Sequence, residues 1–192
     1  MSKRFRGIFC AYCAKEMATT GDHVFAREFF LESGRAKLPQ APACADCNNQ
    51  KSKLEHYLTA VLPFGGKHAD ASTILGSMVP KPLRRNQKLH RHLSDEFTGD
   101  AIPVGGDKLE RLFALIALGF VWYHWKVYVN HQMHAVHYFT ISPPGAQMLD
   151  ASIFKRNARD RVNENIGNGA FIYEGTRHRC GGKSPCAEDC AR

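Results

Sequence analysis

The chain has no apolar run long enough to cross a membrane, since its most apolar stretch, residues 112–121, has about half the required length. The basic residues at its start are not followed by the sustained apolar segment of a secretory signal. Both absences predict a cytoplasmic protein with no membrane partner. A phosphate-binding loop and a Gly-x-Ser-x-Gly motif are also absent, which argues against P-loop nucleotide chemistry and serine-hydrolase chemistry.

Acidic residues are comparatively few. The 18 Asp and Glu residues are outnumbered by 26 Lys and Arg residues, which gives a formal net charge of +8. Such an excess favours a polyanionic partner, because neutralising phosphates releases condensed counterions. A basic stretch that includes Arg84, Arg85, Lys88 and Arg91 could follow a nucleic-acid backbone, or it could be an ordinary solvated helix face.

Seven cysteines are present, an odd number that does not fit a fully paired disulfide framework. Four of them form two C-x2-C pairs: Cys10, Cys13, Cys44 and Cys47. Two such pairs can present four thiolates to one tetrahedral zinc ion, which contributes on the order of 10 kcal/mol to the folding of a small module. The pattern predicts structural zinc, the alternative being two unrelated pairs of buried or redox cysteines. A zinc site alone does not imply catalysis.

An Asp-His dipeptide lies between the two cysteine pairs. Asp22 offers an oxygen ligand to a hard cation, and His23 could deprotonate a water molecule, the two roles that phosphodiester hydrolysis requires. Neighbouring side chains diverge on a strand, so each can serve a different role. Asn48 directly follows the last cysteine of the pairs, so the zinc site would fix its position opposite Asp22. The alternative is a polar turn in which Asp22 caps a helix starting near Val24.

These residues together resemble the HNH endonuclease superfamily, also called ββα-metal or His-Me finger, in its zinc-containing four-cysteine branch. The resemblance covers roughly the first 60 residues and depends on the four paired cysteines, the segment Asp22-His23-Val24, Asn48 and Lys51. It implies that a β-hairpin carries Asp22 and His23 and that a helix follows. It also implies that Asp22 and Asn48 ligate Mg²⁺ or another catalytic divalent ion, with His23 as the general base. Many members have a middle Asn where this chain has Pro39, so Gln40 or a backbone carbonyl would take its place.

The helix expected to begin near Asn48 carries further candidates. A cation at Lys51 could meet a phosphate, and His56 could approach the metal or a phosphate from two turns further along. The alternative for both positions is a solvated helix face on which Glu55 pairs with Lys51 at a spacing of four.

The expected fold is α+β, with a zinc-supported, treble-clef-like ββα-metal module over residues 1–62 and a mainly helical accessory region over 63–192. Apolar spacing predicts helices over 71–78, 82–97 and 107–122, with a terminal strand over 170–173. A tail rich in Cys and His follows, in which four residues could hold a second zinc or remain free: His178, Cys180, Cys186 and Cys190.

The sequence therefore predicts a metal-dependent endonuclease that hydrolyses nucleic-acid phosphodiesters, DNA in the first instance. Two alternatives remain open at this stage. One is a non-catalytic zinc module that binds nucleic acid. The other is an interaction protein controlled by a partner, with a vestigial nuclease site.

Overall fold

The structure is a computed structural model that describes residues 3–61, 70–77, 84, 86–96, 106–129, 144, 147–148, 150–151, 159–167 and 169–177. Its contacts divide the chain into two compact units. The first comprises Met1–Tyr138 with Ile166–Ala170, and the second comprises Phe139–Asn165 with Phe171–Arg192. None of the helices in the described ranges is long and apolar enough to span a membrane.

A short antiparallel hairpin forms the centre of the first unit. Strand β1, Thr20–His23, pairs with β2, Gln40–Ala43, so that Asp22 lies opposite Ala41 and His23 opposite Gln40. Helix α1, Ala45–Val61, begins two residues after β2 ends. The order of strand, strand and helix agrees with the expected module, and α1 begins slightly before the predicted start near Asn48.

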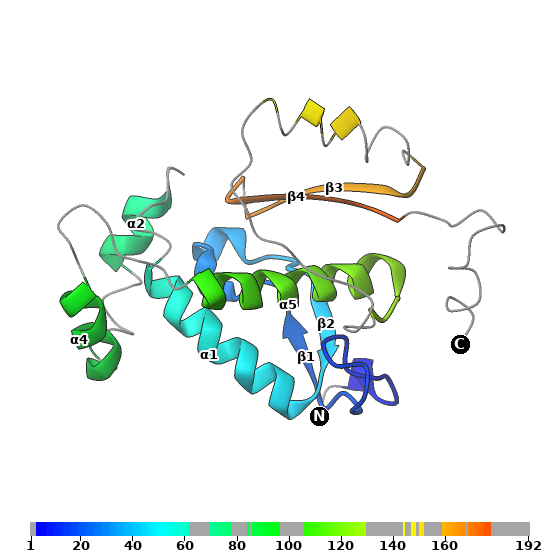
Figure 1. The fold of residues 1–192 in the computed structure, drawn as a ribbon, viewed down its shortest axis with the longest axis horizontal. Coiled ribbons are helices and arrows are strands. Elements are labelled where there is room, and N and C mark those ends of the chain that lie inside the picture. The colour runs from blue at the N-terminus through cyan, green and yellow to red at the C-terminus, as the bar shows by residue number, and fades with distance from the viewer. Residues whose placement is uncertain are drawn as a thin grey trace. The chain divides into compact units, whose positions relative to one another are not determined.

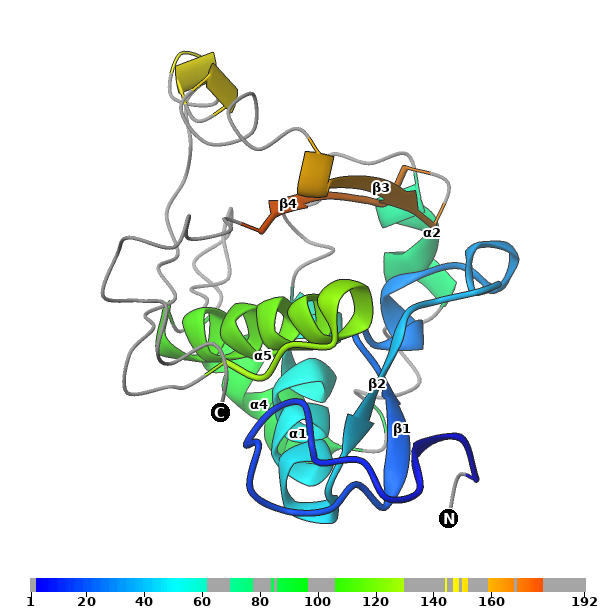
Figure 2. The same ribbon diagram turned by 90° about the vertical axis from the view of Figure 1, so that its right-hand side faces the viewer.

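Helix α5, Gly106–Trp125, packs against both β2 and α1 (Figures 1 and 2). It confirms the helix predicted over 107–122, and its apolar stripe is buried at Leu109, Leu112, Ile116 and Phe120. Gly119 permits the close approach, because a Cβ there would lie 3.0 Å from a Val24 methyl group. Helix α5 thus belongs to the same compact unit as the hairpin, while the domain boundary near residue 62 stays a prediction.

Aromatic side chains fill the core around the hairpin. Phe25 makes edge-to-face contacts with Phe29, Phe30 and Phe120, at centroid distances of 5.5–6.4 Å. Phe5 packs edge-on against Trp122 of α5 at 5.9 Å. Burial of several aromatic rings is a large source of stability for a unit whose strands have only four residues each.

The segment between the two strands contains two single-turn 3-10 helices, Arg27–Phe29 and Glu32–Gly34, and a third, Lys3–Phe5, precedes the hairpin. No α-helix begins near Val24 in this described segment, and Asp22 lies within β1. The alternative in which Asp22 caps a helix is therefore wrong.

The remaining elements agree in part with the sequence predictions. Helix α2, Asp70–Ser77, matches the helix expected over 71–78, and α4, Gln87–Glu96, is shorter than the one expected over 82–97. In the second unit, β4, Phe171–Thr176, matches the predicted terminal strand. Its partner β3, Arg161–Ile166, was not predicted. The mixture of helices and small sheets confirms the α+β class.

Candidate functional site

The four paired cysteines converge in the first unit. The sulfur atoms of Cys10, Cys13, Cys44 and Cys47 all lie within 4.8 Å of one another. Four sulfurs about 2.3 Å from a tetrahedral zinc would be about 3.8 Å apart, which is within that limit. The alternative of two unrelated pairs is wrong, and the cluster could hold a metal ion such as zinc.

Two different local structures present the sulfurs. Cys10 and Cys13 lie in a turn of a small hairpin, where Ala14 N–H donates to Cys10 O at 2.9 Å and Cys10 N–H donates to Glu16 O at 2.8 Å. Cys44 follows β2 directly, and Cys47 lies in the first turn of α1. There Cys47 N–H donates to Cys44 Sγ at 3.5 Å. A helix N-terminus favours negative charge, so it suits a thiolate ligand.

The electrostatics of the cluster favour a bound cation. Burial raises the pKa of Cys10 and of Cys47, and at Cys47 the neighbouring thiols act in the same direction. Burial also acts to raise the pKa of Cys13, but hydrogen bonds from the backbone of Glu16 and Lys15 outweigh it and lower the pKa. If all four thiols lost their protons, the negative sulfurs at this spacing would repel one another, and a divalent ion bound among them would offset that repulsion. The donor set therefore fits a metal that prefers thiolates.

Asp22 is linked to the Cys10–Cys13 turn through Tyr12 and has two internal partners. Its Oδ2 accepts a hydrogen bond from the Tyr12 hydroxyl and forms an ion pair with Lys51 Nζ at 2.9 Å. Oδ1 of Asp22 accepts no hydrogen bond within the described ranges, and 10% of the side chain's surface is exposed. One carboxylate oxygen is held and the other is available to a ligand.

Lys51 is buried, with 0% of its surface exposed. Its ammonium contacts Asp22, Glu55 Oε1 at 2.5 Å and the His23 carbonyl oxygen at 2.7 Å, which provides an acceptor for each of its three protons. This enclosed position corrects two expectations. The phosphate contact expected of Lys51 is replaced by an internal contact with Asp22, and the Lys51–Glu55 pair lies inside the fold rather than on a solvated face.

Glu55 is the second carboxylate beside the ammonium. Burial raises the pKa of Glu55 to about 7, against the opposing effect of the Lys51 charge. Below that pH Glu55 is mostly neutral, and Asp22 is the remaining anionic partner of Lys51. The Asp22–Lys51 pair is thus the central ion pair of the site.

His23 diverges from Asp22, as neighbours on a strand are expected to do. The Gln40 amide nitrogen lies 3.1 Å from His23 Nε2, across the β1–β2 pair. Burial lowers the pKa of His23, and the positive charges of Arg27 and Lys51 act in the same direction, whereas Asp22 raises it. The imidazole is therefore neutral at pH 7. Of the two groups expected to take the place of the middle Asn, it is the Gln40 side chain that contacts His23.

Asn48 lies on the face of α1 that meets β1. It precedes Lys51 by three residues and Glu55 by seven, so the three side chains share one face of the helix. Its half-buried amide makes no side-chain hydrogen bond with the described residues. One helical turn, about 5 Å, separates Asn48 from the Lys51 position that contacts Asp22.

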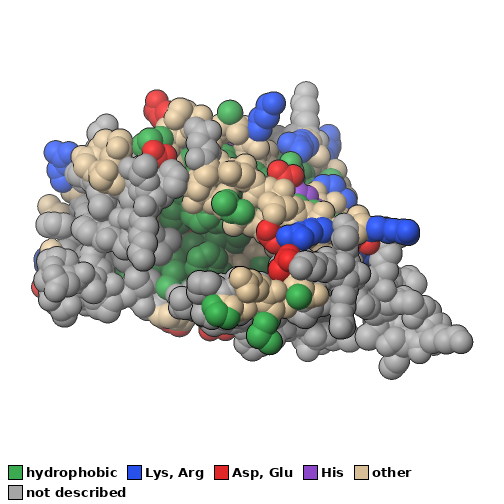
Figure 3. Space-filling model, turned by 90° about the horizontal axis from the view of Figure 1, so that it is seen from above, with side chains coloured by type: hydrophobic (Ala, Val, Ile, Leu, Met, Phe, Trp, Pro, Cys, Tyr) green, Lys and Arg blue, Asp and Glu red, His purple; other side chains and the backbone are tan. Residues whose placement is uncertain are grey.

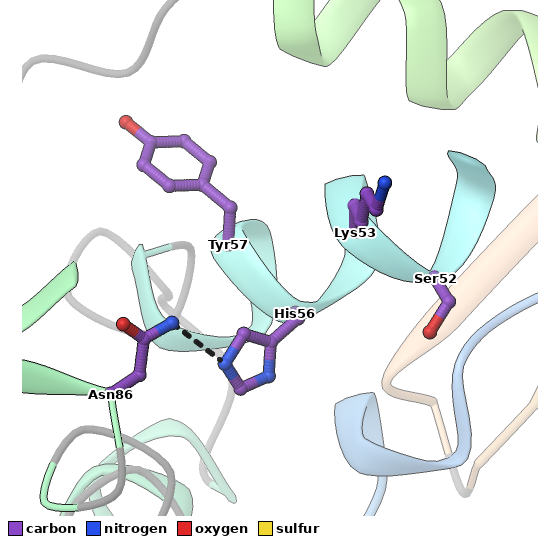
Figure 4. Close-up of a pocket in the computed structure, with 5 residues that line it drawn as sticks. All are labelled: Ser52, Lys53, His56, Tyr57 and Asn86. Carbon is purple, nitrogen blue, oxygen red and sulfur yellow. Dashed lines mark hydrogen bonds between the residues drawn. The ribbon is translucent and has the colours of Figure 1, made fainter. Parts of the chain in front are cut away.

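His56 lies elsewhere on α1. It is exposed and lines an open pocket with Ser52, Lys53, Tyr57 and Asn86, where Asn86 Nδ2 is 3.5 Å from its Nε2 (Figure 4). Eight residues along an α-helix correspond to a rotation of about 80°, so Glu55, not His56, is aligned with Asn48. The structure does not bring His56 to Asp22.

The predicted nucleic-acid contacts of the basic stretch are exposed where their side chains are described, at Arg84, Lys88 and Arg91. Arg85 and the tail residues His178, Cys180, Cys186 and Cys190 lie outside the described residues. On the face drawn in Figure 3, Lys and Arg side chains are interspersed with Asp and Glu side chains. The described atoms of that face form no continuous positive surface.

Two residues of the site were not foreseen as functional. Tyr12 lies between Cys10 and Cys13, and only the folded turn reveals that its hydroxyl meets Asp22. Glu55 was expected on a solvated face, and its burial depends on β1 covering α1.

Comparisons of the chain with protein-family models, with curated proteins and with solved structures find no match.

Proposed function

We propose that the chain is a metal-dependent endonuclease of the HNH, or ββα-metal, type that hydrolyses phosphodiester bonds of nucleic acid, with DNA as the first substrate to test. Zinc on the four cysteines would be structural. Mg²⁺ or a similar ion would be catalytic and would neutralise charge on the scissile phosphate.

The metal-binding roles are assigned to side-chain oxygens of Asp22 and Asn48 that have no hydrogen-bond partner among the described residues. Asp22 Oδ1 accepts no hydrogen bond from the described residues, and the Asn48 amide one turn before Lys51 has no side-chain hydrogen bond to another described residue. These two oxygens are hard ligands suited to Mg²⁺. His23 would take the proton from the attacking water, with Gln40 holding the imidazole.

The observation that carries the proposal is the Asp22–Lys51 ion pair of 2.9 Å. It ties the strand bearing Asp22 and His23 to the helix face bearing Asn48, and Tyr12 of the Cys10–Cys13 turn contacts the same Asp22 oxygen. An Asp-His dipeptide in an ordinary solvated turn would not form an ion pair with a buried lysine such as Lys51.

The experiment is plasmid nicking by purified protein in Mg²⁺ or Mn²⁺. The wild type is expected to nick, and His23→Ala, Asp22→Asn and Asn48→Ala are expected to lower the rate at least 100-fold, since general-base catalysis alone contributes about 10²–10⁴-fold. The matched controls His56→Ala and Asn86→Ala change exposed or partly exposed residues away from Asp22 and should nick at the wild-type rate. Nicking by His23→Ala equal to that of the wild type would refute the proposal.

A second function, a non-catalytic zinc module that binds nucleic acid, is favoured by one observation. Both His23 Nε2 and Asp22 Oδ2 already have internal partners, Gln40 and Lys51. A protein that retards labelled DNA in a gel, at low salt, without nicking it in either metal would support this second function.

A further inference from the structure

We propose that Tyr12 and Lys51 are positioning residues that couple the four-cysteine cluster to Asp22, so that the orientation of the Asp22 carboxylate depends on the Cys10–Cys13 turn. The inference deepens the proposed function and rests on it. It assigns a role to the hydroxyl of Tyr12 and to the internal ammonium of Lys51, neither of which would touch the substrate.

Tyr12 is the link to the cluster. It stands between two of the cysteines, is 2% exposed, and belongs to a buried cluster with Cys10, Cys44 and Leu118. Its ring cannot move without moving the turn that carries Cys10 and Cys13. The hydroxyl of Tyr12 donates a hydrogen bond to Asp22 Oδ2.

Lys51 holds the same oxygen from the helix side. Two donors on Oδ2, one from the Cys10–Cys13 turn and one from α1, leave the carboxylate little freedom to rotate. Oδ1, which accepts no hydrogen bond from the described residues, is then held in a single orientation that a metal ion can use without first ordering the side chain. Lys51 also lies 5.9 Å from the centroid of the Tyr12 ring, so the two positioning residues contact each other.

The consequence is a measurable loss of divalent-ion affinity when the hydroxyl is removed. Partners that hold a metal-ligating carboxylate typically change metal affinity by about 10–100-fold when they are mutated. Tyr12→Phe retains the ring that packs against the cysteines and deletes only the donor to Asp22. The metal on the four sulfurs should therefore remain bound while the site at Asp22 weakens.

The test compares Tyr12→Phe with wild type and with Tyr128→Phe. The control loses an equivalent hydroxyl, which donates to Phe9 O at 3.4 Å and does not meet Asp22. Mn²⁺ affinity is measured from the electron paramagnetic resonance of free Mn²⁺, zinc content by elemental analysis, and nicking rate against Mn²⁺ concentration. For Tyr12→Phe we expect affinity about 10–100-fold weaker, unchanged zinc content and a near-normal rate at saturating Mn²⁺; Tyr128→Phe should match wild type.

A second variant guards against misfolding. Lys51→Met with Glu55→Gln removes the ammonium together with one buried carboxylate, and it should weaken Mn²⁺ binding as well. If the wild type nicks and Tyr12→Phe binds Mn²⁺ with unchanged affinity, or loses its zinc, the positioning role is wrong while the proposed function stands. If the wild type neither binds Mn²⁺ nor nicks, the proposed function fails, and this inference fails with it.

Discussion

Two cations in this protein are each paired with two carboxylates, yet they lie in very different surroundings. In the first unit, Lys51 pairs with Asp22 and Glu55 and is fully buried. In the second unit, Arg161 of β3 pairs with Asp150 at 3.1 Å and Glu174 of β4 at 2.9 Å, with about a third of each side chain exposed. The same charge pattern is a buried core element in one hairpin region and a surface contact in the other.

This difference follows from how far the residues of each pair of strands are buried. Strands β1 and β2 have four residues each; α5 packs on β2, and the buried Lys51 of α1 contacts Asp22 and His23 of β1, so polar side chains there find partners inside the protein. Strands β3 and β4 have six residues each and expose many of them, including Ile172. Water can replace any partner lost from the second hairpin but not from the first.

Removal of the metal from the cysteine cluster should have the largest effect. Structural zinc contributes on the order of 10 kcal/mol to a small module, so a strong chelator should unfold the region around β1, β2 and α1. Hydrogen exchange of peptides from residues 8–61 should become fast. Peptides from 161–165 and 171–176, which belong to the second unit, should not change, because a two-stranded hairpin is marginally stable in either condition. Equal responses of the two regions would contradict the comparison.

The second largest difference is expected when the central cation of each region is removed, Lys51 in the first unit and Arg161 in the second. Lys51→Met leaves Asp22 with Glu55 in a buried site, and breaking a buried pair costs about 3–5 kcal/mol. Arg161→Met removes a partly exposed cation, and such pairs are worth up to about 1 kcal/mol. Urea unfolding of both variants measures the two losses in free energy. Only the Arg161 contribution should fall at high salt, since buried pairs are screened much less.

A smaller effect is expected from close packing at β1. A Cβ added at Gly21 would lie 2.4 Å from Phe5 Cε2, so Gly21→Ala forces the ring that packs on Trp122 to shift, at about 1–3 kcal/mol. The matched control Gly76→Ala lies on α2 with no atom within 4 Å of the new methyl group, and should be neutral or stabilise by about 0.5–1 kcal/mol. Thermal unfolding of the two variants compares them directly. A similar melting temperature for both would show that β1 tolerates displacement.

The sequence predicts the four-cysteine cluster better than it predicts the contacts of the residues around Asp22. The C-x2-C spacing predicts that Cys10, Cys13, Cys44 and Cys47 converge, because each pair is local and a tetrahedral metal site needs two such pairs. The burial of Lys51 and Glu55 could not be predicted, since helical spacing gives the pair but not which face β1 covers. The contact of Tyr12 with Asp22 depends on the tertiary path of the Cys10–Cys13 turn. Strand β3 was missed because its residues are mostly polar and half of them are exposed.

The central claim is that one chain holds two metals of different character in neighbouring sites. The most direct measurement is anomalous diffraction from Mn²⁺-soaked crystals at the zinc and manganese absorption edges. We predict a zinc peak among the four sulfurs and a manganese peak at Asp22 Oδ1 within reach of the Asn48 side chain. A zinc peak with no manganese at Asp22 would contradict the nuclease account and leave a structural zinc protein.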